Sequence, residues 1–247
     1  MTNIYNDIIQ AKTENLKLLA ILLDPDKIIW ENLELLIEKI SQSPATHIFI
    51  GGSHVQNNIL DELIIKIRQA SFLEGRCALP IVLFPGNPSQ ISVQADAILF
   101  LSLISGRNPD YLIEHQVDAV PILKRTQLEI ISTGYILIES GGETAVARVS
   151  KTQPLDRNNS DYVVQTAQAG EMIGNKLIYL EAGSGAKQAV PFEMIKKVSN
   201  NIEIPLIVGG GIIDLQGIQK AYEAGADLVV IGTAFENDHN FFESSPI

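Results

Sequence analysis

The sequence contains a single cysteine, Cys77, among 247 residues. A disulfide bond within the chain is therefore excluded, and we interpret Cys77 as a small buried residue. No apolar stretch approaches the roughly 20 residues that cross a membrane as a helix. The first 17 residues are polar and lack the apolar segment of a signal peptide. These absences predict a cytoplasmic protein without a transmembrane segment.

Basic residues are also scarce. Lysine and arginine number 18 against 29 aspartate and glutamate residues, which gives a net charge of -11. A general nucleic-acid-binding protein needs a basic surface to neutralise phosphates, so this class of function is excluded. Hydrophobic residues make up 46% of the chain and charged residues 19%, an ordinary globular composition. We expect one domain that covers residues 1–247.

The most regular feature is a series of short apolar runs, many of which end in glycine or small polar residues. Such runs are typical of parallel strands that are covered on both faces. We assign eight strands to residues 18–23, 47–50, 80–84, 95–101, 134–138, 176–180, 205–208 and 227–231. Helical segments separate most of these strands. The alternation predicts an α/β fold, and with this chain length it favours a single (β/α)8 TIM barrel.

Helical spacing of apolar residues predicts a leading helix at residues 3–15 and later helices at 30–40, 57–70, from 109, and at 161–172, 191–199 and 215–224. Residues 117–133 are less regular, and there we predict a short extended segment at 120–123. The polar segment 149–160 contains Pro154 and is predicted to be a loop that closes over the site.

Glycine-rich turns follow the last two predicted strands. Gly209, Gly210 and Gly211 come after one strand, and Gly232 and Thr233 come after the next. Glycines let the backbone approach a ligand, and exposed N–H groups at the start of a helix bind anions. Because this is the usual place of the phosphate site in a (β/α)8 barrel, we expect a phosphorylated substrate. Many unrelated barrel enzymes share this feature, so it indicates a ligand class and not a reaction.

Polar residues after the other strands complete the candidate site, because the loops after the strands carry the active site of a barrel. Asp24 could hold Mg2+ or cap the next helix, and Lys27 could meet a phosphate or lie in solvent. Ser53 could be a hydroxyl ligand or a helix cap. Glu181 could bind a substrate hydroxyl, act as a base or form a buried salt bridge. Tyr179 could reach the phosphate or remain in the core.

Several motifs occur in one order along the chain: Leu22-Leu-Asp-Pro-Asp-Lys27, Gly51-Gly-Ser53, Tyr179-Leu-Glu-Ala-Gly-Ser-Gly185, Val208-Gly-Gly-Gly-Ile212 and Gly232-Thr233. Together they resemble the geranylgeranylglyceryl phosphate synthase family, which includes the bacterial heptaprenylglyceryl phosphate synthases. The resemblance runs from Leu18 to Phe235, and the motif that begins at Tyr179 is its most distinctive part.

The resemblance implies a modified barrel in which less regular structure replaces one outer helix, here at residues 85–93. It implies transfer of a prenyl group from its diphosphate to the primary hydroxyl of sn-glycerol 1-phosphate, with ether formation and release of diphosphate. Asp24 and Ser53 resemble the family's Mg2+ ligands, and Asp24 and Glu181 would carry catalysis. The substrate would contact Lys27, Tyr179, Leu180, Glu181, Ala182, Gly183, Ser184, Gly185, Gly210, Gly211, Gly232 and Thr233.

The resemblance also sets expectations about the prenyl donor and the partners. The segment from Asp24 to Lys27 is more similar to the branch that uses geranylgeranyl diphosphate than to the heptaprenyl branch, so we expect the shorter donor. A homo-oligomer and a peripheral membrane contact for product release are expected as well.

Two other classes of function compete with this one. Another phosphate-binding barrel enzyme, such as a sugar-phosphate isomerase or epimerase, would need an acid–base pair across the barrel but no long apolar groove. A non-catalytic phosphate sensor would bind its ligand without turnover.

Overall fold

The computed structural model describes residues 3–52, 57–73, 78–238 and 240–242. Parallel strands β1 to β8 pair in sequence order, and β8 pairs with β1 to close a barrel. They are β1 (Leu18–Leu23), β2 (His47–Ile50), β3 (Ile81–Leu83), β4 (Ala97–Leu103), β5 (Glu129–Leu137), β6 (Leu177–Glu181), β7 (Leu206–Gly209) and β8 (Leu228–Ile231). The predicted α/β barrel is therefore confirmed.

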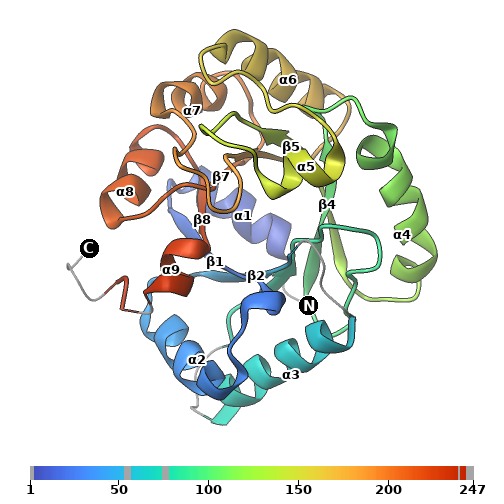
Figure 1. Ribbon diagram of the computed structural model, residues 1–247, viewed down its shortest axis with the longest axis vertical. Helices are drawn as coiled ribbons and strands as arrows, with labels where there is room; N and C mark the ends of the chain where they lie inside the picture. Colours follow the sequence, from blue (N-terminus) through green and yellow to red (C-terminus); the bar gives the residue numbers. More distant parts are fainter. Residues whose placement is uncertain (1–2, 53–56, 74–77, 239, 243–247) are drawn as a thin grey trace.

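An outer ring of helices surrounds the strands (Figure 1). It comprises α2 (Leu33–Gln42), α3 (Asn57–Leu73), α4 (His115–Leu123), α6 (Ser160–Met172), α7 (Phe192–Ser199) and α8 (Leu215–Glu223). Each presents apolar residues to the sheet at helical spacing, as Met194, Ile195 and Val198 do on α7. None of the helices within the described residues combines the length and the apolar character that crossing a membrane requires.

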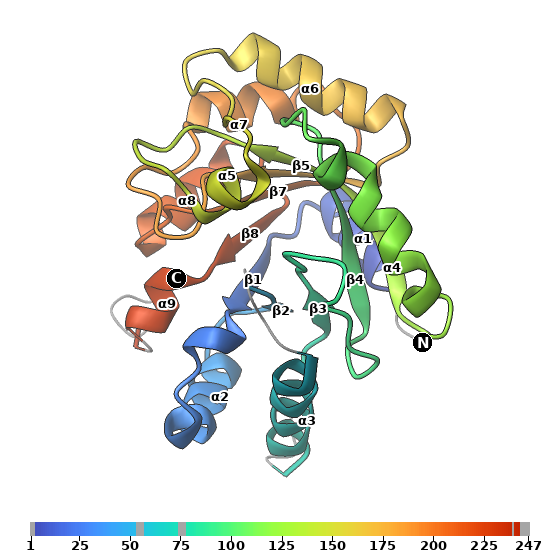
Figure 2. The same ribbon diagram turned by 45° about the vertical axis from the view of Figure 1, so that its right-hand side comes forward.

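The barrel wall is irregular between β3 and β4. Residues 84–96, all of which the structure describes, form turns and bends without a helix (Figure 2). β3 pairs with β4 only at Val82↔Ala97 and Leu83↔Ile98, whereas β4 continues beside β5 as far as Leu103. The predicted replacement of one outer helix is thus confirmed, and β4 extends beyond the end of its neighbour.

The least regular part of the sequence was predicted wrongly. Residues 120–123 are not extended but belong to α4, which follows a π-helical turn, η3 (Asp110–Glu114). Gln116, Ala119 and Leu123 form the buried face of α4 at helical spacing, and the helix accommodates Pro121. β5 begins at Glu129, five residues before the predicted start at Gly134.

The segment predicted as a closing loop is partly helical. α5 (Ala145–Ser150) includes its first residues, and Thr144 caps α5 by accepting a hydrogen bond from Ala147 N–H. The rest is tied to the end of β5, where Leu155 N–H donates to Leu137 and Glu139 N–H donates to Leu155. The segment is therefore part of the barrel rim.

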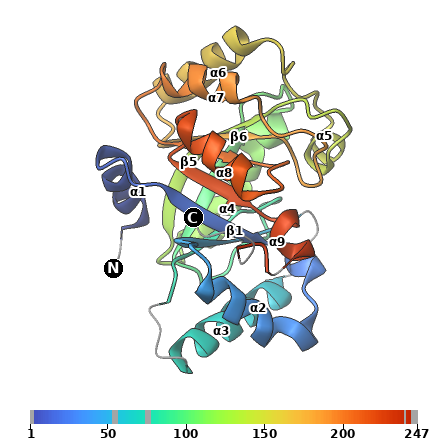
Figure 3. The same cartoon turned by 90° about the vertical axis from the view of Figure 1, so that its left-hand side faces the viewer.

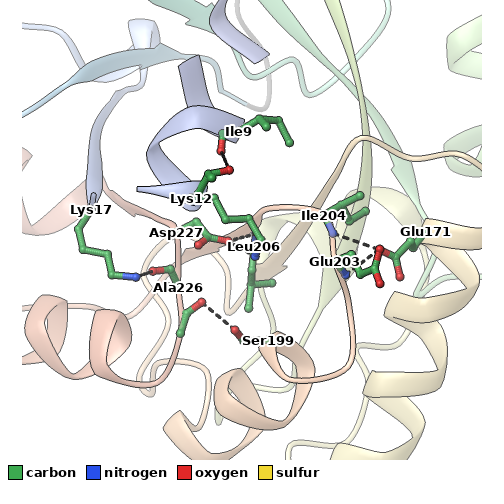
Figure 4. Close-up of polar contacts among 12 residues, drawn as sticks. Ile9, Lys12, Lys17, Glu171, Ser199, Glu203, Ile204, Leu206, Ala226 and Asp227 are labelled. Atoms are coloured by element: carbon green, nitrogen blue, oxygen red, sulfur yellow. Dashed lines mark hydrogen bonds and ion pairs between the residues drawn. The ribbon is translucent and has the colours of Figure 1, made fainter. Parts of the chain in front are cut away.

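The two ends of the barrel differ. α1 (Ile4–Thr13) covers the end where the strands begin, and α5 and α9 (Thr233–Asn237) lie at the opposite end (Figure 3). Lys12 of α1 pairs with Asp227 at 3.0 Å, and Asp227 also accepts from Leu206 N–H at 2.9 Å (Figure 4). We call the end where the strands begin the lower end and the end where they finish the upper end. Because α1 closes the lower end, the upper end is left for ligand binding.

Alternation along the strands separates two apolar layers. On β6, Leu177 and Tyr179 point into the barrel with Phe49, Val82 and other interior residues, and Ile8 of α1 packs beneath them. Ile178 and Leu180 point outward and pack under the helices. This alternation directs Glu181, the last residue of β6, into the upper end of the barrel.

Candidate active site

A cavity of about 710 Å³ occupies the upper end of the barrel. Its floor is formed by three aromatic rings in mutual contact. The centroid of Phe84 lies 5.3 Å from that of Tyr179, which it stacks on, and 5.9 Å from that of Tyr135, whereas Tyr135 meets Tyr179 edge-on at 5.4 Å. The residues that follow β1, β6, β7 and β8 line the cavity above these rings. The floor separates the polar upper end from the apolar barrel interior.

Glycine backbones form the wall near β6 and β7. Gly210 has a φ of +79°, and a Cβ at this position would lie 2.2 Å from Glu181 Oε1 and 2.6 Å from Gly183 N. Gly183 has a φ of +101°, and its Cβ would lie 2.3 Å from Thr144 Cγ2. Only glycine fits this close approach of the two strand ends. The turns therefore present bare backbone to the cavity.

Glu181 lies within this wall and is 5% exposed. Its Oε1 accepts a hydrogen bond from Gly183 N–H at 2.6 Å. Burial raises the pKa of the Glu181 carboxyl to about 7, and the Gly183 N–H and the nearby Tyr179 hydroxyl oppose this rise. The Tyr179 hydroxyl lowers the pKa of the Glu181 carboxyl from nearby, without the geometry of a regular hydrogen bond. Glu181 can thus exchange a proton near neutral pH.

A charged cluster lies farther round the wall, after β1 and β8. Lys27 Nζ is 3.2 Å from Glu236 Oε2 of α9 and 3.5 Å from Asp24 Oδ2. Burial alone would lower the pKa of Lys27, but Glu236 and then Asp24 raise it above the ordinary value. Asp24 Oδ1 accepts from Asp26 N–H at 3.2 Å, as expected for a helix cap. Asp24, Lys27 and Glu236 all line the cavity.

The oxygen atoms available in the cavity wall after β1 are compatible with Mg2+. Within the described residues, no group of three or more His, Cys, Asp or Glu side chains is arranged to hold a metal ion. Mg2+ needs no such group, because it is commonly held by one or two carboxylates together with substrate phosphates and water. The Asp24 carboxylate, 20% exposed in the cavity wall, can supply one oxygen of this kind.

An apolar arm extends the cavity through the irregular part of the barrel wall. Its lining includes Leu99 on the inner face of β4 as well as Ile98 on the outer face and Ala119 on α4. Access to both faces of β4 follows from the short β3 and from the missing helix after it. The arm is predominantly apolar, in contrast to the glycine-rich end beside Glu181.

Most of the residues predicted from the sequence meet at this cavity. Those that line it are Asp24, Lys27, Tyr179, Glu181, Gly183, Ser184, Gly185, Gly210, Gly211, Gly232 and Thr233. Leu180 and Ala182 do not, because both are fully buried in the outer layer between strands and helices. Their predicted contact with the substrate therefore stays a prediction. Ser53, predicted as a metal ligand, lies outside the described residues.

Sequence reasoning missed Glu236 and the apolar arm. Glu236 belongs to the short helix α9, which begins at Thr233, and no sequence motif indicates that Glu236 lies close to Lys27. The arm depends on β4, which was predicted as a strand, and on α4, most of which lies in the segment 117–133 that was hardest to assign. The short segment between the third and fourth strands was the one available signal of an opening.

Comparisons with known proteins agree with this arrangement. The PcrB family model matches residues 7–244. A geranylgeranylglyceryl phosphate synthase from Flavobacterium johnsoniae is 68% identical over 244 residues, covering 99% of this chain and 98% of the relative. One from Picrophilus torridus is 36% identical and covers 98% of this chain and 96% of the relative.

A solved structure is similar over the same length. The crystal structure of (S)-3-O-geranylgeranylglyceryl phosphate synthase from Thermoplasma acidophilum, in complex with its substrate sn-glycerol-1-phosphate, superposes with a TM-score of 0.89. The two sequences are 31% identical, and the match covers 99% of this chain and 96% of that chain. The similarity therefore extends far beyond the glycine turns that unrelated barrels share. This chain belongs to the PcrB family, and its resemblance to geranylgeranylglyceryl phosphate synthases is confirmed.

Proposed function

We propose that this protein transfers a geranylgeranyl group from geranylgeranyl diphosphate to sn-glycerol 1-phosphate, forming an ether and releasing diphosphate. One observation carries the proposal: a single cavity joins a glycine-lined polar end to an apolar arm that passes through the barrel wall. A phosphorylated acceptor fits the first and a prenyl chain fits the second. A sugar-phosphate isomerase or a phosphate sensor has no use for the arm.

The acceptor phosphate is proposed to bind at the ends of β7 and β8. Gly210, Gly211, Gly232 and Thr233 line this part of the cavity. The first N–H groups of α9 have no acceptor within the helix, and such groups bind phosphate oxygens. Gly183, Ser184 and Gly185 face them from the end of β6, so the glycerol can reach Glu181.

Glu181 is proposed to hold the primary hydroxyl of the acceptor and to take its proton. The hydroxyl oxygen forms the new bond to the allylic carbon of the donor while the bond from that carbon to the diphosphate oxygen breaks. The diphosphate leaves with the electron pair, and the hydroxyl proton passes to the Glu181 carboxylate. Because no covalent enzyme intermediate is needed, the main task of the site is to position two substrates and to balance charge.

This role predicts a pH dependence. The ionised form of Glu181 accepts the proton, and its pKa is about 7. We expect kcat/KM to rise with pH through about 7 and to level off above it, whereas an ordinary glutamate would give the plateau from about pH 5.5. The phosphate of the acceptor also titrates near pH 6 and would contribute to the profile. Glu181→Gln is the control, because its residual pH dependence comes from the substrate and not from residue 181. A wild-type profile that is flat from pH 6 to 8 would contradict the role.

The same pKa shift predicts a gain in stability for Glu181→Gln. Burial raises the folded-state pKa from 4.5 to about 7, so ionised Glu181 destabilises the fold, and this cost grows as pH rises between those values. At pH 8 we expect the variant to be more stable by up to about 3 kcal/mol, and near pH 4.5 by little. Urea unfolding at both pH values measures the difference. Equal stability at pH 8 would argue against a raised pKa.

Mg2+ is proposed to bind at Asp24, with Ser53 as a further ligand by family resemblance. The reaction brings a phosphate and a diphosphate together, and the residues lining the cavity include Asp24, Glu181 and Glu236. Among the described lining residues, Lys27 is the only lysine or arginine. A divalent cation would supply the missing positive charge and stabilise the leaving diphosphate. The site residues therefore favour a Mg2+-dependent enzyme.

The donor length is proposed from the loop after β1, which is similar to the branch that uses geranylgeranyl diphosphate. With geranylgeranyl and heptaprenyl diphosphates at equal concentrations, we expect mainly the geranylgeranyl ether, because the closed end of an apolar groove limits the chain it accepts. Mass spectrometry of the products measures the ratio. An excess of the heptaprenyl ether would reject this donor and leave the reaction class untouched.

We further propose, from the family resemblance, that the chain works in the cytoplasm as a homo-oligomer. An exposed apolar row formed by Ile113, Val117 and Val120 on η3 and α4 is compatible with a protein contact or with a transient membrane contact during product release.

A further inference from the structure

A carboxylate without an assigned role lines the proposed diphosphate side of the cavity. Glu236 of α9 lies beside Lys27, which follows β1, so the contact joins the first and last strands of the closed barrel. Its side chain is only 18% exposed. A negative charge here opposes the binding of two anionic substrates unless it is paired with a positive group. The structure supplies that group as the Lys27 ammonium.

Two carboxylates compete for this ammonium. Lys27 Nζ forms a hydrogen bond with Glu236 Oε2 at 3.2 Å, whereas its separation from Asp24 Oδ2 is 3.5 Å. The other Asp24 oxygen, Oδ1, already accepts from Asp26 N–H. Oδ2 is therefore the Asp24 oxygen for which Lys27 and a metal ion would compete. The balance between the Lys27–Glu236 and Lys27–Asp24 contacts therefore decides how readily a metal ion can bind Asp24 Oδ2.

We propose that Glu236 is a positioning residue that draws the Lys27 ammonium toward itself, at 3.2 Å, and so weakens the ion pair of Lys27 with Asp24, at 3.5 Å. This inference rests on the proposed function, since it concerns Mg2+ and diphosphate binding. Shared with Glu236, the ammonium remains in the cavity wall as a partner for the diphosphate, and a metal ion can displace it from its longer contact with Asp24 Oδ2. Without the Glu236 charge, Lys27 pairs more closely with Asp24 and competes more strongly with the metal.

The test measures metal binding directly, with Mn2+ as the probe because it also prefers oxygen ligands in octahedral geometry. Electron paramagnetic resonance titration of the full chain gives the Mn2+ dissociation constant. For Glu236→Gln we expect it to rise about fivefold, within the range of coupling between neighbouring charges. Calorimetric titration with inorganic diphosphate and Mg2+ should show a parallel loss. Glu223→Gln is the matched control, since Glu223 is exposed on α8 and contacts Gln219.

A double variant separates an effect through Lys27 from a direct effect of the Glu236 charge. In a Lys27→Met background no ammonium competes for Asp24, so adding Glu236→Gln should leave the Mn2+ affinity unchanged within about twofold. A further fivefold loss in that background would overturn the proposal, because Glu236 would then act on the metal itself. An unchanged Mn2+ affinity in the single variant, with a native circular dichroism spectrum, would overturn it too.

Wild-type protein from the same preparation is assayed for prenyl ether formation. If wild type forms the ether while Glu236→Gln binds Mn2+ normally, only the role of Glu236 is rejected. If wild type forms no ether, the proposed function itself is rejected.

Discussion

Asp24→Ala is expected to lower turnover by about a thousandfold or more, which corresponds to about 4 kcal/mol of lost transition-state stabilisation. In our account Asp24 holds the Mg2+ that offsets the charge of the leaving diphosphate. Few other positive groups can replace it, because Lys27 is the only lysine or arginine among the described residues that line the cavity. The fold should survive, since the substitution removes one cap hydrogen bond, worth about 1 kcal/mol, and the partly exposed ion pair with Lys27, which contributes little.

Steady-state kinetics over a range of Mg2+ concentrations measures this effect. Asp26→Ala is the matched control, because Asp26 lies in the same turn but is exposed and does not line the cavity. Asp26→Ala should keep wild-type turnover. If Asp24→Ala also kept it, with the same Mg2+ dependence, the metal assignment would have to be abandoned.

The second large effect is expected at Gly210. In Gly210→Ala, the new Cβ would lie 2.2 Å from Glu181 Oε1 and 2.6 Å from Gly183 N, and the residue would keep a φ of +79°. Relief of this contact must move Glu181 or the β7 turn, where the phosphate is proposed to bind. We expect kcat/KM to fall by about a hundredfold and the free energy of unfolding to fall by about 2 kcal/mol.

Gly174→Ala separates backbone strain from displacement of Glu181. Gly174 has a φ of +99°, but its Cβ would meet nothing within 4 Å. It follows α6 at the opposite end of the barrel and does not line the cavity. This control should lose about 1 kcal/mol of stability and no activity. Equal kinetics for the two variants would place the acceptor away from the β7 turn.

The strands were predictable because a parallel strand covered on both faces reads as a continuous apolar run. The start of β5 was missed because Ser132 and Thr133 interrupt such a run, although Thr133 is fully buried and donates to Ile131. Residues 120–123 were predicted to be extended, yet α4 continues through Pro121 because one face of the helix is buried. Tertiary packing overrode the local preference in both places.

The part of the candidate site that could be predicted is the part whose residues follow one another at the end of a single strand. Strand alternation on β6 directs the Leu180 side chain outward, since Tyr179 points into the barrel and Glu181 lines the cavity on either side of it. The contact of Lys27 with Glu236 spans 209 residues, and the apolar arm depends on the relative lengths of β3 and β4. Only the closed barrel brings these features together.

The most direct test of the account is the reaction itself. The protein is incubated with Mg2+, geranylgeranyl diphosphate and isotopically labelled sn-glycerol 1-phosphate, and the products are analysed by mass spectrometry. The account predicts a labelled geranylgeranyl ether of glycerol phosphate and one released diphosphate for each ether formed. Folded protein that binds sn-glycerol 1-phosphate but forms no ether with any prenyl diphosphate would contradict it.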